Sequence, residues 1–456
     1  MLRVHASLIA PLCLFAASPH SAAHAADPAG PSIPHERYQL ANGLDVVIAP
    51  DDATPTVHVE VWYHVGSKDE RKGRTGFAHL FEHLMFQGSL NADDEYFTPF
   101  QAVGASINGT TNVDRTNYYQ TLPASHLPLA LFMEGDRMGN LLPALTLDKL
   151  DNQREVVRNE RRQRYENPPY GEAWVDLMAA LHPVGHPYHH PTIGSHEDLE
   201  AATLDDVRDF FNTWYVPSNA TLVIVGDVDI PTTKQLVQKH FGWIPKAKVP
   251  ATPLRDPAPV ALPESVVIDQ RQDVPEHRLW AAWHSPPHFA PGDAELDVLA
   301  DVLCGGDDGR LIQALVKTQR VARTVSCGQV SRSLGSFFLV TATAADGFTT
   351  PEVMAAADAV LEGFFREAPA TADEVATAQA QIEASMYRRL STVAGRSGLI
   401  STFLNALDTA DAVAAQLHNY QRVTPDAVMQ VGSDVLRAPR VELHIGPPIA
   451  SDEESN

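Results

Sequence analysis

Long apolar runs and basic side chains are both scarce in this chain of 456 residues. The apolar stretch near the start, Leu8 to Ala17, spans roughly ten residues, too few for a helix that crosses a bilayer. No later stretch is longer, so we expect no membrane span. Lys and Arg number 34 against 57 Asp and Glu, which gives a formal net charge of −23. Because nucleic acids are bound through clustered basic side chains, we expect no nucleic-acid partner.

The first 25 residues have the pattern of a secretory signal peptide. Arg3 precedes the apolar stretch, and Ala23-His24-Ala25 fits a small-x-small cleavage site. We therefore predict that residues 1–25 are a signal peptide and that the protein is exported to a bacterial periplasm. A mitochondrial transit peptide is the alternative, although such peptides are usually richer in Arg and Ser.

Cysteine is also scarce, and only Cys304 and Cys327 follow the leader. An exported protein can pair two cysteines in a disulfide. Two buried thiols fit the sequence equally well.

Proline divides the chain in two. A Pro-rich segment, residues 246–264, disfavours helix and central strand and is expected to be an extended linker. It separates residues 33–245 from residues 265–447, and each part has the size of one domain. The acidic residues 448–456 are expected to be a disordered tail.

The first half combines short strands with longer helices. Asn42-Gly43 predicts a hairpin turn, and the alternating valines from Val57 to Val65 predict a strand with one buried face. Further elements are expected as helices at residues 76–86, at 146–166 and from Thr203, and as a strand at residues 220–225.

The second half repeats this order of elements. A strand is expected at residues 279–284, a helix at 294–303, helices from Thr371 and Thr424, and a strand at 441–445. The repetition predicts an α+β fold with two homologous domains. Each would be a mostly antiparallel sheet with helices packed on one face.

Metal chemistry is indicated by the sequence His79-Leu80-Phe81-Glu82-His83. On a helix, His79 and His83 lie one turn apart on one face, so both imidazoles can reach one ion. Zinc suits such ligands, and a catalytic zinc takes three protein ligands and leaves a position open for water. Glu82 would take a proton from that water as general base. The alternative is a helix with two surface histidines, but the surrounding apolar residues predict burial, and buried polar groups need partners.

A third ligand is expected on the helix that begins at Thr146. Glu160 follows Val156 and Val157 by one turn, so its carboxylate lies on their packed side. Glu155 follows polar residues on its own side and is the weaker candidate.

These residues resemble the inverted-motif zinc peptidases, or inverzincins, of the M16 type, which include pitrilysin, insulin-degrading enzyme and mitochondrial processing peptidase. The resemblance covers nearly the whole chain after the leader. It is carried by Val65-Gly66-Ser67, residues 76–86 and residues 154–160. In that family a glutamate about 77 residues after the second histidine is the third ligand, which is Glu160 here. The resemblance implies one Zn²⁺ per chain, and the length is similar to that of the half-size members, which work as dimers.

The repeat indicates that the second half has no metal site. Apolar or small residues stand where the first half has its metal-binding motif and glutamate: Leu296, Leu299, Ala300 and Ser385. We expect this half to serve as scaffold and substrate wall.

Two places depart from the family pattern. Family members often carry a glutamate seven residues before the third ligand, where Gln153 stands here, so Gln153 is expected to tune the ligands by hydrogen bonding without charge. In the family, an arginine and a tyrosine in the half facing the zinc help to hold substrate, and Val316 and Arg323 take those places. We therefore predict a heterodimer in which a similar, zinc-less subunit supplies the Arg/Tyr pair. A homodimer is the alternative, since dimers are usually symmetric.

Residues Ile107 to Asn112 predict an exposed edge strand. In the family the matching strand binds peptides by β-addition, so Asn108, Gly109 and Thr110 are predicted to bind substrate through main-chain hydrogen bonds. The alternative is a turn between strands.

Four histidines lie among prolines: His182, His186, His189 and His190. Their number is typical of a second metal site, but the prolines break any helical face. We expect a loop with solvated histidines.

Together these features predict a zinc metallo-endopeptidase that hydrolyses peptides or unfolded polypeptide segments, with Glu82 as general base. Two alternatives keep the fold without the reaction. One is a catalytically silent structural subunit that has kept a zinc site, against which the intact Glu82 argues. The other is a folding or assembly factor that binds peptides without cutting them.

Overall fold

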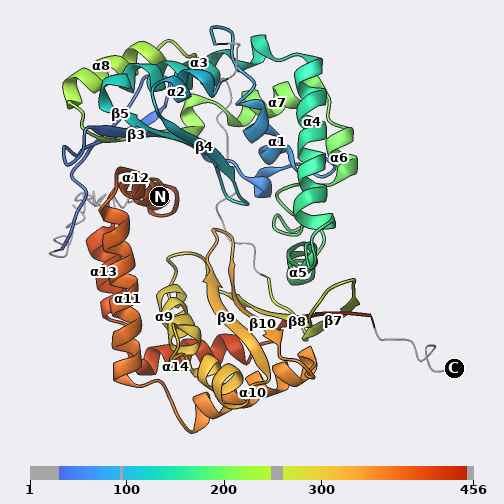
Figure 1. Cartoon of the computed structure of the whole chain (residues 1–456). Coiled ribbons are helices and arrows are strands. Elements are labelled where there is room, and N and C mark those ends of the chain that lie inside the picture. The colour runs from blue at the N-terminus through green and yellow to red at the C-terminus, as the bar shows by residue number, and fades with distance from the viewer. Residues whose placement is uncertain (1–29, 93–95, 248–259, 449–456) are drawn as a thin grey trace, which may run out of the picture.

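The computed structural model describes residues 30–92, 96–247 and 260–448. The predicted leader, nearly all of the predicted tail and the middle of the predicted linker lie outside these ranges. In Figure 1 the blue-to-green half of the chain lies above the yellow-to-red half, and each half contains one sheet.

The first sheet has six strands in the order β1-β2-β6-β3-β5-β4. Neighbouring strands are antiparallel except β2 and β6, which are parallel. Strand β4 is the last in the order, which confirms the predicted edge strand and excludes a turn there. The bounds are β1 Glu36–Gln39, β2 Asp45–Pro50, β3 Thr56–Tyr63, β4 Ser106–Thr111, β5 Thr116–Pro123 and β6 Ala220–Gly226.

The second sheet repeats the first, without a counterpart of β1. Its order is β7-β11-β8-β10-β9, with β7 and β11 parallel and the other pairs antiparallel. The shared order confirms two similar α+β domains. The bounds are β7 Val266–Arg271, β8 Arg278–Ser285, β9 Ala322–Val330, β10 Ser336–Ala344 and β11 Val441–Gly446.

The helices of the two halves fall in similar places between the strands, except that α8 follows the last strand of the first half and has no counterpart among the described residues after β11. Those of the first half are α1 Phe77–Leu84, α2 Thr98–Ala102, α3 Leu127–Ala144, α4 Leu147–Arg161, α5 Ala173–Leu181, α6 His196–Glu200, α7 Leu204–Trp214 and α8 Ile230–Phe241. Those of the second half are α9 Asp293–Cys304, α10 Thr350–Arg366, α11 Ala372–Leu390, α12 Val393–Leu407, α13 Val413–Gln421 and α14 Pro425–Leu436. Two π-helical segments, η3 (Arg162–Glu166) and η5 (Ile312–Thr318), complete them.

Threonine side chains start the four helices whose first residues were predicted from a threonine in the sequence. Each of Thr146, Thr203, Thr371 and Thr424 accepts a hydrogen bond from the backbone N–H three residues later, which satisfies a donor that the helix leaves unpaired. The four predicted helix starts are thereby confirmed.

Each sheet packs its own helices on one face, as predicted, and the helices of the other half cover the second face. Against the first sheet, β2 and β6 pack on Leu399, Ile400 and Phe403 of α12. Against the second sheet, α5 packs with Leu177 and Leu181. The two halves therefore bury apolar surface reciprocally, which stabilises their association.

This arrangement corrects the prediction for the strand that begins near Val57. Every residue of β3 after Thr56 is buried, so the strand has two buried faces rather than one. The valines face the helices of the first half, and Glu60 on the alternate face bonds to α12. A polar strand face is usually solvent-exposed, and only the packing of the distant second half buries this one.

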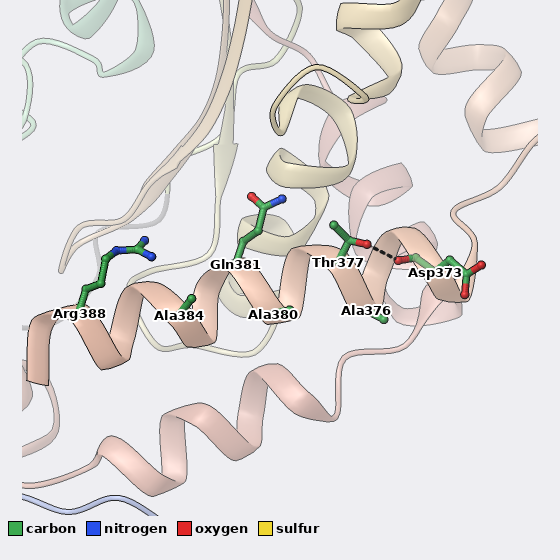
Figure 2. Close-up of a pocket in the computed structure, with 7 residues that line it drawn as sticks. All are labelled: Asp373, Ala376, Thr377, Ala380, Gln381, Ala384 and Arg388. Atoms are coloured by element: carbon green, nitrogen blue, oxygen red, sulfur yellow. Dashed lines mark hydrogen bonds between the residues drawn. The ribbon is translucent and has the colours of Figure 1, made fainter.

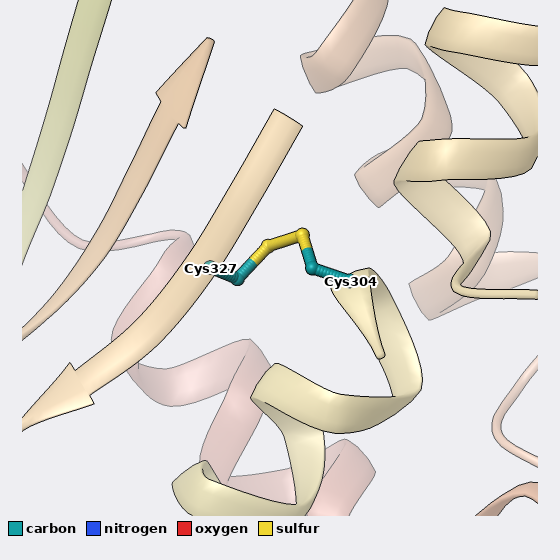
Figure 3. The surroundings of a disulfide bond; sticks show 2 residues. All are labelled: Cys304 and Cys327. Carbon is teal, nitrogen blue, oxygen red and sulfur yellow. A yellow bond between two sulfur atoms is a disulfide. The ribbon is translucent and has the colours of Figure 1, made fainter. Parts of the chain in front are cut away.

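Cys304 and Cys327 form a disulfide that joins the end of α9 to β9, with their Cα atoms 5.5 Å apart (Figure 3). The sequence left this pairing open. No helix in the described ranges combines the length and the apolar character needed to cross a membrane.

Candidate metal centre

The metal-binding motif lies on α1, whose start is held by two unusual contacts. Gly76, just before the helix, has a φ of 85°, and a Cβ there would lie 2.7 Å from the carbonyl oxygen of Ile193. Only glycine fits this position. The buried Glu70 carboxylate accepts hydrogen bonds from the N–H groups of Gly76 (2.9 Å) and Ala78 (2.7 Å). These bonds cap the helix and fix the direction in which it presents its histidines.

Two imidazoles and one carboxylate converge where α1 packs on α4. His83 Nε2 lies 3.2 Å from Glu160 Oε2, and His79 Nε2 lies 3.7 Å from Glu160 Oε1. All three possible ligand atoms lie within 4.8 Å of one another. In the described ranges this is the one group of three His, Cys, Asp or Glu side chains close enough to share an ion. The structure thus brings together the three predicted ligands.

The spacing and the donor set fit zinc. Two ligands at roughly 2.1 Å from a tetrahedral zinc are about 3.4 Å apart, close to the distances found here. Two nitrogens and one carboxylate are a common set of ligands for a zinc that keeps one position open.

The protonation states of the ligands also suit a metal. Burial lowers the pKa of His79 to about 4, so this imidazole is neutral at physiological pH and its lone pair is free to bind metal. Burial alone would raise the pKa of Glu160, but a hydrogen bond from His83 and the charge of Arg164 outweigh it, and the pKa is lowered. Arg164 lies one turn after Glu160, and their side chains are 2.7 Å apart.

Glu82 has the opposite shift, which suits a proton acceptor. Burial raises its pKa above the ordinary value for a glutamate. A raised pKa makes the ionised carboxylate a stronger base, closer to what proton transfer near neutral pH requires. Gly109 of β4 lies beside it, because a Cβ built on Gly109 would be 3.2 Å from Glu82 Cγ. The edge strand and the predicted base are therefore immediate neighbours.

The three residues predicted to bind substrate all lie on β4. Asn108 Oδ1 accepts the Gly109 N–H at 2.9 Å, so the side chain satisfies an amide next to the strand edge. Thr110 is held from inside the sheet: its hydroxyl donates to Asn117 Oδ1 (2.6 Å), and its carbonyl accepts from Arg115 Nη1 (2.7 Å). The Thr110 hydroxyl and the Gly109 N–H are thus already hydrogen-bonded within the chain, and main-chain pairing of β4 with a peptide stays a prediction.

Gln153 is buried on α4, two turns before Glu160. Its amide nitrogen donates to Asn152 Oδ1 at 2.8 Å. The Nδ1 atom of His79 is buried and has no hydrogen-bond partner within the described ranges. The tuning role predicted for Gln153 stays a prediction.

Sequence reasoning missed Glu70 and Arg164. Arg164 follows Glu160 by four residues, a spacing that brings side chains together on a helix, so this contact could have been found. Glu70 precedes α1 through an irregular loop, and no local pattern identifies it as the helix cap.

The second half carries no such centre. The counterpart residues Leu296 and Leu299 are buried in the core of that half, and Ser385 is exposed on α11. An open groove of about 780 Å³ runs along α11, and Figure 2 shows it lined by small and polar side chains such as Ala380 and Gln381. Arg323 forms ion pairs with acidic side chains of its own half, at 2.6 Å to Glu276 and 2.5 Å to Asp346.

The histidine-rich loop departs from the prediction. His182 and His186 are buried, with rings 4.6 Å apart, and His284 of β8 lies 5.5 Å from His182. His182 and His186 are not solvated, because the loop follows α5, which packs on the second sheet. His186 Nδ1 accepts the Tyr188 N–H (3.0 Å), which leaves the proton of a neutral imidazole on Nε2. That nitrogen then has no lone pair for a metal, so the loop is a packed contact between the halves.

A duplicated α+β fold with one His-His-Glu group in the described ranges defines a two-domain protein with a candidate metal site. Comparison with known families is consistent with both features. Residues 45–182 match the family model described as insulinase (peptidase family M16), and residues 201–382 match the model described as the peptidase M16 inactive domain. The chain belongs to the M16 peptidase family.

Relatives of this chain include named zinc proteases. The zinc protease PqqE of Helicobacter pylori is 32% identical over 295 residues, which are 63% of this chain and 65% of that protein. The match spans just under two thirds of the relative. The β subunit of the mitochondrial-processing peptidase of Saccharomyces cerevisiae is 25% identical over 55% of each chain.

Solved structures share the fold over nearly the whole chain. A crystal structure of a protease from Helicobacter pylori has a TM-score of 0.83 and 26% sequence identity, and covers 91% of this chain and 100% of its own. A peptidase M16 inactive domain from Pseudomonas fluorescens, at 16% identity, has a TM-score of 0.80 and supports the fold alone.

Proposed function

We propose that this protein is a zinc metallo-endopeptidase that cuts peptides or unfolded polypeptide segments. The observation that carries the proposal is the convergence of His79, His83 and Glu160 beside a buried glutamate, Glu82. The named zinc proteases among its relatives support the same activity.

Each residue has a distinct part in the reaction. His79, His83 and Glu160 would hold the zinc. When bound, zinc lowers the pKa of a coordinated water and polarises the substrate carbonyl. Glu82 accepts the proton of the attacking water and returns it to the leaving amine. Strand β4 holds the peptide extended next to Glu82 by β-addition, which explains how substrates of different sequence could bind.

The match to the inactive-domain family does not argue against activity. It begins at residue 201 and therefore contains none of the metal-binding residues of the first half. It runs from the end of the first half into the second and includes the buried leucines that replace the motif there.

We also propose that the active form is a dimer and that the protein is exported. Val316 and Arg323 stand where the family has its substrate-holding pair, and the ion pairs of Arg323 already occupy its guanidinium. A similar, zinc-less subunit that supplies an arginine and a tyrosine would complete the site. The Cys304–Cys327 disulfide supports an oxidising compartment such as the periplasm.

The experiment is to incubate a quenched fluorogenic peptide library with the zinc-loaded chain, alone and with any similar zinc-less protein encoded beside it. We expect internal cleavage, identified by mass spectrometry of the products, that a chelator abolishes and added zinc restores. Cleavage only with the second protein would support the heterodimer. Absence of cleavage in every mixture, with zinc bound, would contradict the proposed reaction.

A further inference from the structure

A buried carboxylate links the two halves directly behind the catalytic face of the first sheet. Glu60 lies on β3, on the face that packs against α12, and is 3% exposed. Its Oε2 accepts hydrogen bonds from the hydroxyls of Ser397 (2.6 Å) and Ser401 (2.9 Å), both of which are on α12. The second half therefore reaches into the sheet that carries the substrate strand.

The other oxygen of Glu60 continues this connection toward β4. Asn117 Nδ2 on β5 donates to Glu60 Oε1 at 2.6 Å. Asn117 Oδ1 in turn accepts from the hydroxyl of Thr110 on β4 (2.6 Å) and from Arg115 Nη1 (3.1 Å). A continuous hydrogen-bonded path thus runs from α12 through β3 and β5 to the residue next to Gly109.

A second contact holds the turn between β4 and β5. Asp114 Oδ2 accepts the backbone N–H of Ser333, in the loop between β9 and β10, at 3.2 Å. Asp114 Oδ1 accepts from the hydroxyl of Tyr188 at 2.6 Å. The second half therefore contacts the β4–β5 hairpin directly at its turn, and reaches its strands through Glu60 of β3 and Asn117.

Burial of the Glu60 carboxylate is difficult to explain as a contribution to stability alone. Burying a carboxylate carries a desolvation penalty of several kcal/mol, and apolar residues in such places are often as stable or more so. The hydrogen-bond donors to Glu60 in the described ranges are all neutral, and the positive charge that acts on it is the buried guanidinium of Arg115, which also donates to Asn117. What the path provides is directional bonding, which fixes the lateral position of β4 where apolar packing would tolerate sliding.

We propose that Glu60 is a positioning residue through which α12 of the second half holds β4 in register beside Glu82. This rests on the proposed function, because it assumes that β4 binds the peptide. It assigns the second half a direct role in catalysis: the path sets where the main-chain groups of β4 meet those of the peptide.

The test compares peptides that differ only in main-chain hydrogen bonding. The full-length, zinc-loaded chain with Glu82→Gln would bind a fluorescein-labelled decapeptide and a set of its singly N-methylated forms, measured by fluorescence anisotropy. N-methylation at a residue paired with β4 is expected to weaken binding about tenfold. In the Ser397→Ala/Ser401→Ala variant of this protein, that penalty is expected to fall to about twofold or less.

Matched variants separate positioning from general destabilisation. Thr402→Ala removes a hydroxyl from the same helix that bonds only to the Gly398 carbonyl, and should keep the tenfold penalty. Glu60→Gln should keep it too, because an amide can accept from Asn117 and donate to both serines. Glu60→Leu should lose it. A merely weakened fold would reduce the affinity for the decapeptide and for its N-methylated forms equally, and would leave the ratio of the two affinities unchanged.

An unchanged penalty in both the double serine variant and Glu60→Leu would overturn the inference. Absence of binding by any peptide, both to the chain alone and in the presence of the similar zinc-less protein, would overturn it as well, together with the docking role of β4. If peptides bind with the expected penalties but the chain with Glu82 cuts none of them, the proposed reaction fails and the positioning role of Glu60 stands.

Discussion

Burial sets the protonation of the residues around the metal centre in opposite directions. It lowers the pKa of His79 to about 4 and so keeps a neutral nitrogen ligand, while it raises the pKa of Glu82 and so favours a basic carboxylate. Glu160 is half-buried, yet its contacts with His83 and Arg164 keep its pKa low and its charge negative. One helix pair thus supplies the whole group: α1 carries His79, Glu82 and His83, and α4 carries Glu160.

Removing the carboxylate ligand should release the metal. In Glu160→Gln, we expect the affinity of the chain for zinc to fall about 10- to 100-fold, because an amide is a weaker ligand than a carboxylate and carries no charge. Zinc retained after dialysis against graded chelator concentrations, measured by plasma mass spectrometry, gives the result. Glu155→Gln is the matched control, since this glutamate lies on the same helix and pairs only with Arg158 at the surface. Equal zinc retention in both variants would remove Glu160 from the ligand set.

At the scale of residues, the sequence predicts those members of the candidate centre whose positions depend on spacing along one helix. His79, Glu82 and His83 follow from the motif, and Glu160 follows from the family resemblance and from its place one turn after Val157. Val157 is buried as expected, but Val156, expected on the same packed side, is exposed. Glu60 and Glu70 could not be found this way. Their roles depend on which distant segments lie against them, and α12 reaches Glu60 across more than 300 positions of sequence.

At the scale of elements, α1 and α9 show how one helix position has diverged between the halves. Helix α1 carries two of the three proposed metal ligands, and α9 carries buried leucines and a row of aspartates. Helix α9 is joined to its edge strand by a disulfide, whereas α1 meets β4 through noncovalent packing alone. The half that lacks the His-His-Glu group is thus the one in which a covalent bond joins this helix to the edge strand.

The disulfide should contribute measurably to stability. Replacing both Cys304 and Cys327 with serine is expected to lower the free energy of unfolding by about 3 kcal/mol, because the link closes a loop of 23 residues in the unfolded chain. Urea denaturation of the oxidised protein and of the double variant measures the difference. A thiol assay on the unfolded oxidised protein serves as control. Identical midpoints would show that the pair does not stabilise the folded half.

Asp297 on α9 should make stability depend on pH. Burial raises its pKa to about 7, well above the roughly 3.9 of an exposed aspartate. The folded chain therefore holds a proton that the unfolded chain has released, and stability falls as pH rises from about 4 through 7. Asp297→Asn, which keeps the acceptor for the Tyr420 hydroxyl, is expected to raise the melting temperature at pH 8 and to change it little at pH 4.

The control for this effect is Asp209→Asn, the same substitution at an exposed position in the middle of α7. It should change the melting temperature little at either pH. A destabilised Asp297→Asn at pH 8 would contradict the account of this buried carboxyl.

The elements were predictable where local chemistry determines them. Threonine caps placed four helix starts, and the Asn42-Gly43 turn lies between β1 and β2. The second buried face of β3 and the buried histidines after α5 were not predictable, because burial there comes from the opposite half of the molecule.

At the scale of the whole molecule, each half completes the other. Helices α12 and α13 cover the first sheet and α5 covers the second, so neither sheet would keep a buried second face on its own. The repeat in the sequence predicted two similar domains and their order of elements. It could not predict this reciprocal packing, since a pattern within one segment does not show which other segment will cover it.

The central claim is that Glu82 is the base of a metal-dependent peptidase, and one comparison tests it most directly. Turnover of a peptide cut by the unsubstituted chain would be measured for Glu82→Gln and Glu155→Gln, together with zinc content per chain. We expect Glu82→Gln to keep about one zinc and to lose about 10²- to 10⁴-fold in turnover, while Glu155→Gln keeps both. Glu82→Gln that binds zinc and cuts at the unsubstituted rate would contradict the account.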